Sequence, residues 1–436
     1  MEKSNVELPE LLQASSRQVW VQAIGRSLYQ AGYGVIQFYV PLIFVNQVGL
    51  SATAVGIGIG SGSLAGVLGH LLGGYLADSQ AYGRKRTLLI SAGLSILSAL
   101  FFVETQTLPL LVIANLLLGL SAGCYWTAAD AAVIDVTSSE QRHKAFAVMV
   151  LADSLGGGLG ILGGGVLLAM AAQIHVLFLG TTVLFLLFLL LVLLAVVETR
   201  QDDVERVQPL QGFVKALKDR SLQLFVLVNI LFTTYIALVN STLPLYFTNV
   251  MSETASETVS GAASGTTLVS VANLFTWCYV GIGAVLQWPL VQGLNSVLRV
   301  RVLMLSMLLW CIGFCLVWAA GFVTSMPLIS MVAAFGLLSI ATAIYKPFAP
   351  AIVAELAPKS SRGIYLAISY QCWSIGYFVG PIVGGWAMDQ SHPIADYAWM
   401  VASASTLFGL VILYFLGQRR RSTHTTPAAD DTVSVM

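Results

Sequence analysis

The sequence predicts an all-α membrane protein with twelve transmembrane helices, arranged as two pseudo-symmetric six-helix bundles. The first reason is composition: hydrophobic residues make up 57% and charged residues 10% of the chain, whereas soluble domains carry about 25% charged residues. The second is a series of long apolar runs, and the third is the placement of the basic residues between them. Because lipid offers no partner to an open sheet edge, the spanning elements must be helices.

Twelve apolar runs follow one another, and a helix needs roughly 20 residues to cross the bilayer. The runs cover about 18–45, 52–77, 87–106, 109–135, 145–171, 174–197, 222–249, 266–292, 302–322, 327–354, 363–388 and 396–417. A long charged gap, about 199–221, separates the first six runs from the last six. The gap 250–265 is rich in Ser and Thr and contains no Lys or Arg.

The basic residues predict how the chain crosses the membrane. All but two of the 21 Lys and Arg residues lie in the two tails or in every second gap, and the alternate gaps contain neither residue. Basic loops stay in the cytoplasm, so we expect a multi-pass protein of the inner or plasma membrane with both termini cytoplasmic. The exceptions, Arg26 and Lys346, lie inside apolar runs, where a cation is costly and usually functional.

The chain also divides into two related halves. The fifth and eleventh runs share one glycine pattern, and Asp135 and Glu355 precede these runs at equivalent positions. The glycines are Gly156, Gly160, Gly164 and Gly165 in the first half and Gly376, Gly380, Gly384 and Gly385 in the second. A parallel repeat of this kind is typical of transporters, with the substrate site between the halves. The predicted parts are a cytoplasmic tail (1–17), a bundle (18–198), a cytoplasmic linker (199–221), a bundle (222–417) and a cytoplasmic tail (418–436).

Three motifs carry a resemblance to a known family. The loop from Gly73 to Leu89 reads GGYLADSQAYGRKRTLL, which is similar to the G-x-L-A-D-R-x-G-R-K pattern of the major facilitator superfamily, although Ser79 replaces an Arg and two extra residues precede Gly83. Over about 18–417 the chain resembles the twelve-span drug:proton antiporter branch. The resemblance implies that Asp78 meets the start of the eleventh span and gates transport. The alternative is a solvated loop that only orients the chain. The matching gating residues are Gly74, Asp78, Gly83, Arg84 and Lys85.

The other two motifs match in part. The fifth span follows the antiporter spacing G-x8-G-x3-G-P-x2-G-G, but Ala147 stands at the first Gly position and Ile161 at the Pro position, whereas the eleventh span keeps Gly380-Pro381. Glycine lets helices approach closely, so a general packing seam is an equally good interpretation. In the fourth span the family often has an Arg where this chain has Asn115. Any group that couples transport to protons must therefore lie elsewhere.

Buried charges are the candidates for that coupling. Helical rise places Arg26, Asp153 and Lys346 at similar depths, roughly 12 Å from the inner ends of their spans, with Asp130 shallower. An adjacent Arg favours the ionised carboxylate, whereas burial favours the neutral form. We therefore expect Asp153, and secondarily Asp130, to exchange protons as a conformational change separates Asp153 from Arg26. The alternative is a static salt bridge. His70 is better explained as a satisfied polar group.

Polar and aromatic residues predict the wall of a substrate cavity. Arg26, Gln30, Tyr33 and Gln37 share one face of the first span, because they recur at helical spacing. The full set of cavity candidates is Gln30, Tyr33, Gln37, Trp126, Asn229, Thr233, Asn240, Lys346, Tyr370 and Trp373. Lys346 would bind an anionic group of the substrate, act as an internal counter-ion, or snorkel to the surface. The aromatic residues are also ordinary packing residues.

These observations favour a secondary active transporter that exports amphipathic small molecules or drugs in exchange for protons. An uptake symporter for a small metabolite, and a membrane sensor that does not transport, are the alternatives. The chain has no cluster of nucleophile and base, no Gly-rich phosphate loop and no Cys or His spacing for metal, so we expect no enzyme, cofactor or metal site. Its net charge of zero gives no reason to expect nucleic acid. The expected partners are the substrate, protons and the lipid bilayer, and the expected state is a monomer.

Overall fold

The computed structural model describes residues 17–138, 141–171, 173–199, 216–256, 265–322, 327–358 and 362–424. Twelve of its helices are long and apolar enough to cross a membrane, which confirms the predicted fold class. The first six are α2 (Arg17–Asn46), α3 (Ala52–Asp78), α4 (Gly83–Glu104), α5 (Leu108–Asp135), α6 (Arg142–Ala171) and α7 (Ile174–Ala195). The next are α9 (Arg220–Ser256), α10 (Gly265–Leu274), η1 (Phe275–Gly281), α11 (Ile282–Leu294), α12 (Arg299–Ala320), α13 (Pro327–Leu356), α14 (Arg362–Met388) and α15 (His392–His424).

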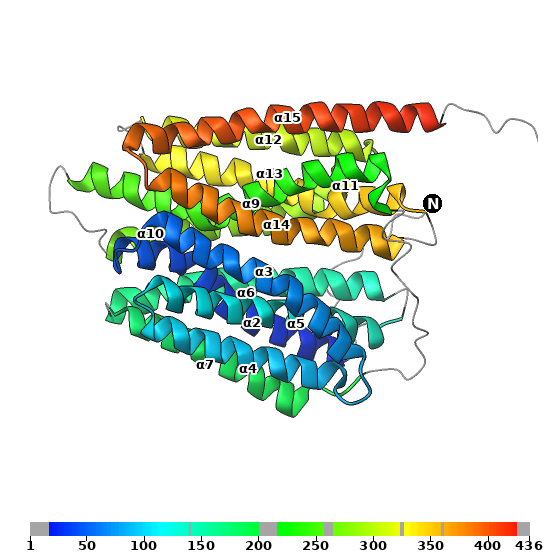
Figure 1. Ribbon diagram of the computed structural model, residues 1–436, viewed down its shortest axis with the longest axis horizontal. Helices are drawn as coiled ribbons and strands as arrows, with labels where there is room; N and C mark the ends of the chain where they lie inside the picture. The colour runs from blue at the N-terminus through cyan, green and yellow to red at the C-terminus, as the bar shows by residue number, and fades with distance from the viewer. Residues whose placement is uncertain are drawn as a thin grey trace, which may run out of the picture.

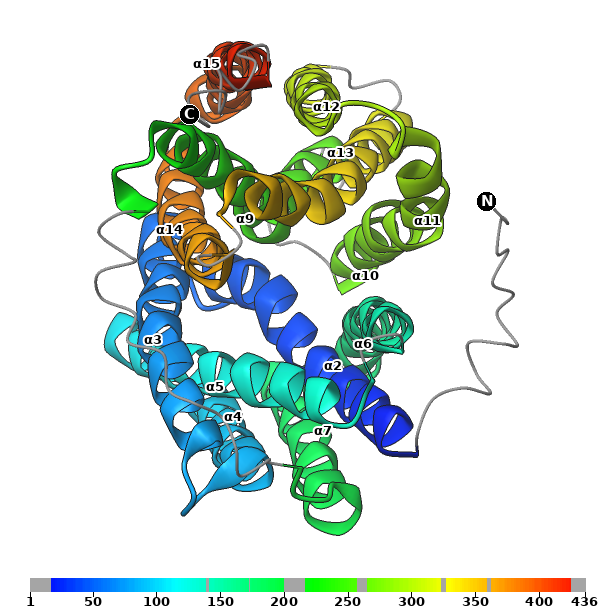
Figure 2. The same cartoon turned by 90° about the vertical axis from the view of Figure 1, so that its right-hand side faces the viewer.

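The helices form two bundles that lie side by side. Figure 1 shows α2–α7 in one layer and α9–α15 in the other, and Figure 2 shows the same division from one end. Helices α3, α5, α7, α10 and α13 begin at one end of the molecule, and α4, α6, α9, α12 and α14 begin at the other. We call the second end the basic end, because Arg84, Arg142, Arg220, Arg299 and Arg362 lie there. The first is the neutral end.

Two spans have distinctive local features. The eighth span is one rod in three segments, because a π-helical stretch, η1, lies between α10 and α11. The tenth span contains Pro347 and Pro350, and α13 continues as helix through both of them. Most of the predicted linker and most of each predicted tail lie outside the described residues, whereas residues 418–424 continue α15.

Glycines set the spacing of the helices within each bundle. A Cβ atom on Gly156 would lie 2.3 Å from the carbonyl oxygen of Ser27, and one on Gly160 would lie 2.2 Å from that of Ala31. In the other bundle, a Cβ on Gly376 would lie 2.3 Å from the hydroxyl of Thr233. The pairs α2–α6 and α9–α14 are therefore built alike, as the sequence repeat predicts.

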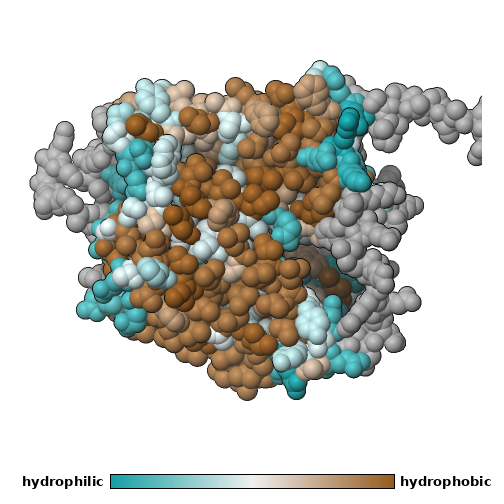
Figure 3. All heavy atoms as spheres, in the orientation of Figure 1, coloured by the Kyte–Doolittle hydropathy of each residue, from teal (hydrophilic) through white to brown (hydrophobic). Residues whose placement is uncertain are grey.

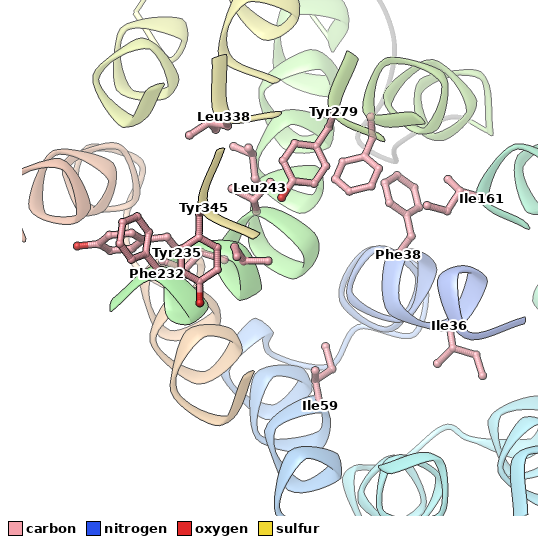
Figure 4. Packing of buried hydrophobic residues seen from close by; sticks show 14 of the residues in the cluster. Ile36, Phe38, Ile59, Ile161, Phe232, Tyr235, Leu243, Tyr279, Leu338 and Tyr345 are labelled. Atoms are coloured by element: carbon pink, nitrogen blue, oxygen red, sulfur yellow. The ribbon is translucent and has the colours of Figure 1, made fainter. Parts of the chain in front are cut away.

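The two bundles meet closely at the neutral end. A Cβ on Gly56 of α3 would lie 2.1 Å from the carbonyl oxygen of Pro381, and one on Gly385 would lie 2.2 Å from that of Ala52. The rings of Phe38 on α2 and Phe275 on η1 are 5.1 Å apart. Figure 4 shows the region around this contact, with Phe38 on one bundle and Tyr279 of η1 on the other.

A carboxylate completes this junction. Asp389 follows α14, and it accepts hydrogen bonds from the backbone N–H groups of Ala52 (2.7 Å) and Thr53 (2.8 Å) and from the hydroxyl of Thr53 (2.5 Å). Ser51 accepts another, from Ala54. These bonds satisfy free N–H groups in the first turn of α3, and those of Asp389 bridge the two bundles. We call this contact the Asp389 clasp.

The bundles separate toward the basic end. Leu71, Leu72 and Tyr75 on the last turns of α3 are exposed, and α11 has no buried residue. Tyr370 on α14 is 60% exposed. Figure 3 shows the surface hollowed between the bundles at this end. We call this opening the cleft.

Candidate functional site

A cluster of three charges lies in the bundle formed by α2–α7. The Arg26 guanidinium donates through Nε to Asp153 (2.8 Å) and through Nη1 to Asp130 (2.7 Å). Its side chain is 8% exposed, whereas that of Asp130 is 42% exposed. The guanidinium carbon also lies 4.6 Å from the centre of the Trp126 ring, a cation–π geometry. We call Arg26, Asp130 and Asp153 the Arg26 cluster.

Three helices hold this cluster in place. Arg26 comes from α2, Asp130 from α5 and Asp153 from α6. The hydroxyl of Ser27 donates to the carbonyl of Ala152 (3.0 Å), directly beside the ion pair. Because breaking a buried ion pair by removing one partner costs about 3–5 kcal/mol, the three side chains should depend on one another for stability.

More polar side chains surround the cluster. Lys346 of α13 is exposed to the cleft and close enough to Asp153 for the two charges to interact. His70 of α3 and Tyr370 of α14 lie near Asp130. The charged layer that the sequence predicted is therefore present, and it includes residues of both bundles.

The polar stripe of α2 continues toward the neutral end. Gln37 donates to the hydroxyl of Tyr33 (2.8 Å), and both side chains are partly buried. The side-chain oxygen of Gln30 is buried and has no hydrogen-bond partner within the described part of the chain. Across the junction, Asn240 donates to the hydroxyl of Tyr377 (2.8 Å). These residues lie between the cleft and the closed neutral end.

Two predicted cavity residues do not face the cleft in this conformation. Asn229 and Thr233 are 1% and 0% exposed. Asn229 donates to Ser369 and accepts from the Tyr345 hydroxyl (2.5 Å), and Thr233 donates to the carbonyl of Cys372 (2.8 Å). These two residues of the seventh span therefore tie α9 to α13 and α14. Polar residues in a membrane helix avoid lipid, and they do so equally well by facing another helix as by facing a water-filled cleft. Trp373 is partly buried and packs beside Tyr345.

The loop motif forms an ionic cluster at the basic end. Arg84 pairs with Asp78 and, through Nε, with Asp135 (3.0 Å). Gly83 adopts φ +73°, a conformation that glycine tolerates best. A Cβ on Gly74 would meet nothing within 4 Å. The expected contact of Asp78 with the start of the eleventh span is not the one seen here, because Asp78 binds its own bundle.

The neighbours of this cluster repeat in the other half. Glu198 accepts from the backbone N–H groups of Arg84 (2.8 Å) and Lys85 (3.0 Å), and so caps α4. In the second bundle Arg299 pairs with Glu355, the residue that matches Asp135 in the sequence repeat. Both bundles therefore carry an arginine–carboxylate pair at the basic end.

A large apolar groove lies apart from these charges. Its volume is about 890 Å³, and α2, α6 and α7 line it with residues such as Ile24, Leu155 and Leu167. Leu155 and Ile24 are exposed on the outside of the bundle. The groove is therefore a lipid-facing feature rather than part of the cleft. Among the described residues no group of three or more His, Cys, Asp or Glu side chains is arranged to hold a metal ion.

Sequence reasoning missed the Asp389 clasp. Asp389 follows the Gly-rich part of the eleventh span, and Thr53 and Ser51 open the second span. Ser and Thr at a helix start are an N-cap signal, so the start of α3 was recognisable. Its partner from the other bundle was not, because the two segments lie far apart in the sequence.

Twelve membrane-length helices in two related bundles, with a charged cluster facing a cleft between them, define a membrane transporter architecture. A family model described as the Major Facilitator Superfamily matches residues 23–287 and 263–435. The chain belongs to this superfamily, and it is a transporter rather than an enzyme.

Several relatives span nearly the whole chain. Multidrug resistance protein MdtH of Yersinia enterocolitica is 22% identical over 417 residues, which cover 94% of this chain and 96% of the relative. MdtH of Aeromonas hydrophila is 27% identical over 405 residues, covering 90% and 94%. The uncharacterised MFS-type transporter YttB of Bacillus subtilis is 24% identical over 349 residues, covering 79% and 82%. The chain thus resembles the multidrug branch, as its motifs indicated.

Solved structures support the fold. The nucleoside transporter NupG aligns with a TM-score of 0.77 at 12% identity, covering 92% of this chain and 99% of that one. A D-xylose-proton symporter aligns with a TM-score of 0.71 at 17% identity, covering 91% and 96%. At these identities the likeness concerns the fold alone.

Proposed function

We propose that this protein exports amphipathic small molecules in exchange for protons, by alternating access. The observation that carries this proposal is the Arg26 cluster, in which two carboxylates at membrane depth share one arginine beside the cleft. With both carboxylates ionised the cluster carries one excess negative charge, so it can accept one proton without leaving a net charge behind. Asp153 is the main proton carrier in this proposal, with Asp130 second and Arg26 as their counter-charge.

The substrate class follows from the walls of the cleft. Trp126 and Tyr370 border the charged layer, and aromatic faces suit amphipathic and cationic molecules. Substrate and proton then compete for the same carboxylates, which is the physical basis of exchange. The similarity to relatives named multidrug resistance proteins supports export rather than uptake.

The membrane orientation is part of the proposal. We place the basic end in the cytoplasm, because basic loops stay on that side. The conformation described here is then open to the cytoplasm, and the motif at Asp78 and Arg84 closes against the eleventh span only when the basic end closes. A single cysteine replacing Ser138 is expected to react with an impermeant maleimide in inverted vesicles and not in intact cells.

The test is transport by the purified protein in liposomes under an imposed pH gradient. A fluorescent amphipathic cation such as ethidium should move against its gradient, and an uncoupler should abolish the movement. Asp153→Asn should remove gradient-driven transport, since the main proton carrier is lost. Glu104→Gln, an exposed carboxylate at the end of α4, is the control and should behave as the wild type.

Three outcomes would contradict the proposal. Movement of substrate together with protons would indicate a symporter. Binding without movement would indicate a sensor. Unchanged proton dependence in both Asp153→Asn and Asp130→Asn would remove the cluster from the mechanism.

A further inference from the structure

Lys346 faces the Arg26 cluster from the opposite bundle. It lies on α13, its side chain is exposed to the cleft, and it forms no hydrogen bond or ion pair with any described residue. It is nevertheless close enough to Asp153 for their charges to interact. An unpaired cation at membrane depth is expensive, so a partner in another conformation would explain its presence.

The pair Arg26–Asp153 is a poor candidate for a charge separation during transport. Both residues belong to the same bundle, and their helices touch at backbone level through Gly156 and Gly160. The Ser27–Ala152 hydrogen bond adds to this contact. Alternating access in such folds is largely a rocking of one bundle against the other, which leaves these two charges together. Rocking instead changes the distance between the two bundles across the cleft.

Lys346 and Asp153 lie at matching depths on the two walls. Lys346 comes ten residues before the end of α13 at Leu356, and Asp153 comes eleven residues after the start of α6 at Arg142. At 1.5 Å per residue each lies roughly 15 Å from the basic end. The bundles are apart on this side and in contact at the neutral end. Closing the basic end therefore brings the two side chains toward each other.

The charges on the two walls also match. The ionised Arg26 cluster carries one excess negative charge, and Lys346 supplies one positive charge. Arg26 binds Oδ1 of Asp153, and Oδ2 makes no hydrogen bond with a described residue. One proton on the cluster removes the excess charge and, with it, most of the attraction. His70 and Tyr370 also lie on the cleft side of the cluster, near Asp130.

We propose that Lys346 is a positioning residue that pairs with Asp153 when the basic end closes, and that protonation of Asp153 releases it. The inference rests on the proposed proton coupling and adds the group that links protonation to the change of shape. A proton taken up from the neutral side breaks the pair and opens the basic end. Loss of that proton restores the pair and favours closing. The proton forms one O–H bond on Asp153 and leaves as the pair re-forms.

The experiment measures closing of the basic end against pH. Spin labels on cysteines replacing Ser138 and Arg301, both exposed and on different bundles, report the separation, in a protein whose five native cysteines are replaced. In the wild type, raising the pH should shift the distances toward the closed form and change the closed-to-open ratio roughly tenfold, within the range of typical coupling energies. Lys346→Gln should stay open at all pH values, and Lys346→Arg should restore the shift.

Asp153→Asn provides a second variant, should Lys346→Gln fail to fold, and it should also stay open at every pH. A Lys346→Gln protein that still closes as the pH rises, or a Lys346→Arg protein that does not, would overturn the inference. The liposome assay separates this from failure of the proposed function. If the wild type shows no proton-driven transport, the proposed function is wrong. If it does, and Lys346→Gln keeps both that transport and its pH profile, only the role of Lys346 is wrong.

Discussion

Replacing Gly156 by Ala should force α2 and α6 apart. The new Cβ atom would lie 2.3 Å from the carbonyl oxygen of Ser27 and 2.7 Å from its Cα, whereas non-bonded carbon atoms prefer about 3.5–4.0 Å. The helices must therefore separate by about 1 Å, and overpacking of this kind costs about 1–3 kcal/mol. The adjacent Gly157 is a matched control, since a Cβ there would meet nothing within 4 Å.

Comparing Gly156→Ala with Gly157→Ala removes the effect of the higher helix propensity of Ala. Ala is about 1 kcal/mol better than Gly in a helix interior, and both variants receive that gain. The difference in unfolding free energy between Gly156→Ala and Gly157→Ala, measured by titration with SDS in mixed micelles, isolates the packing cost. Proton-driven transport should fall only in Gly156→Ala, because Asp153 lies one turn away. Equal stabilities would refute the argument that this glycine sets the helix distance.

Three further predictions concern other sites. Gly83→Ala should destabilise the protein by about 1–2 kcal/mol in the same titration, because its φ of +73° is left-handed. Gly74→Ala, where a new Cβ would meet nothing within 4 Å, should instead stabilise the helix by up to about 1 kcal/mol. Asp389→Ala should weaken the closed neutral end by about 1 kcal/mol, and spin-label distances across that end should shift toward opening; no shift would contradict the clasp. Asn229→Leu should lower the unfolding free energy by about 1–3 kcal/mol, because it leaves the Tyr345 hydroxyl unpaired. The order of substrate preference should not change. An altered order would show that Asn229 contacts substrate.

The sequence was most informative at positions where placing a charged side chain in the bilayer costs free energy. Arg26, Asp130 and Asp153 stand out because charge in hydrocarbon needs a partner, and the structure joins all three. Lys346 was visible for the same reason. The glycines were visible because the chain repeats their pattern, and Gly156 and Gly376 do pack against equivalent helices.

The residues whose contacts the sequence did not predict share a different property. Asn229 and Thr233 avoid lipid whether they face water or another helix, and their pattern is the same in both cases. The partner of Asp78 depends on which end of the protein is open, and one sequence encodes both states. For the same reason, periodicity along the chain gave no indication that Asp389 would meet α3.

The Asp389 clasp makes the closed neutral end sensitive to the salt concentration around it. Asp389 is exposed and Thr53 is partly exposed at the neutral end, so their contact lies in reach of dissolved ions. Attraction between a carboxylate and a helix start is weakened by salt, and the Debye length shrinks from about 10 Å at 0.1 M to about 3 Å at 1 M. Higher salinity on that side alone would therefore loosen the closed neutral end. The rate of turnover would then respond to the ionic strength at the neutral end, although no ion needs to enter the cleft.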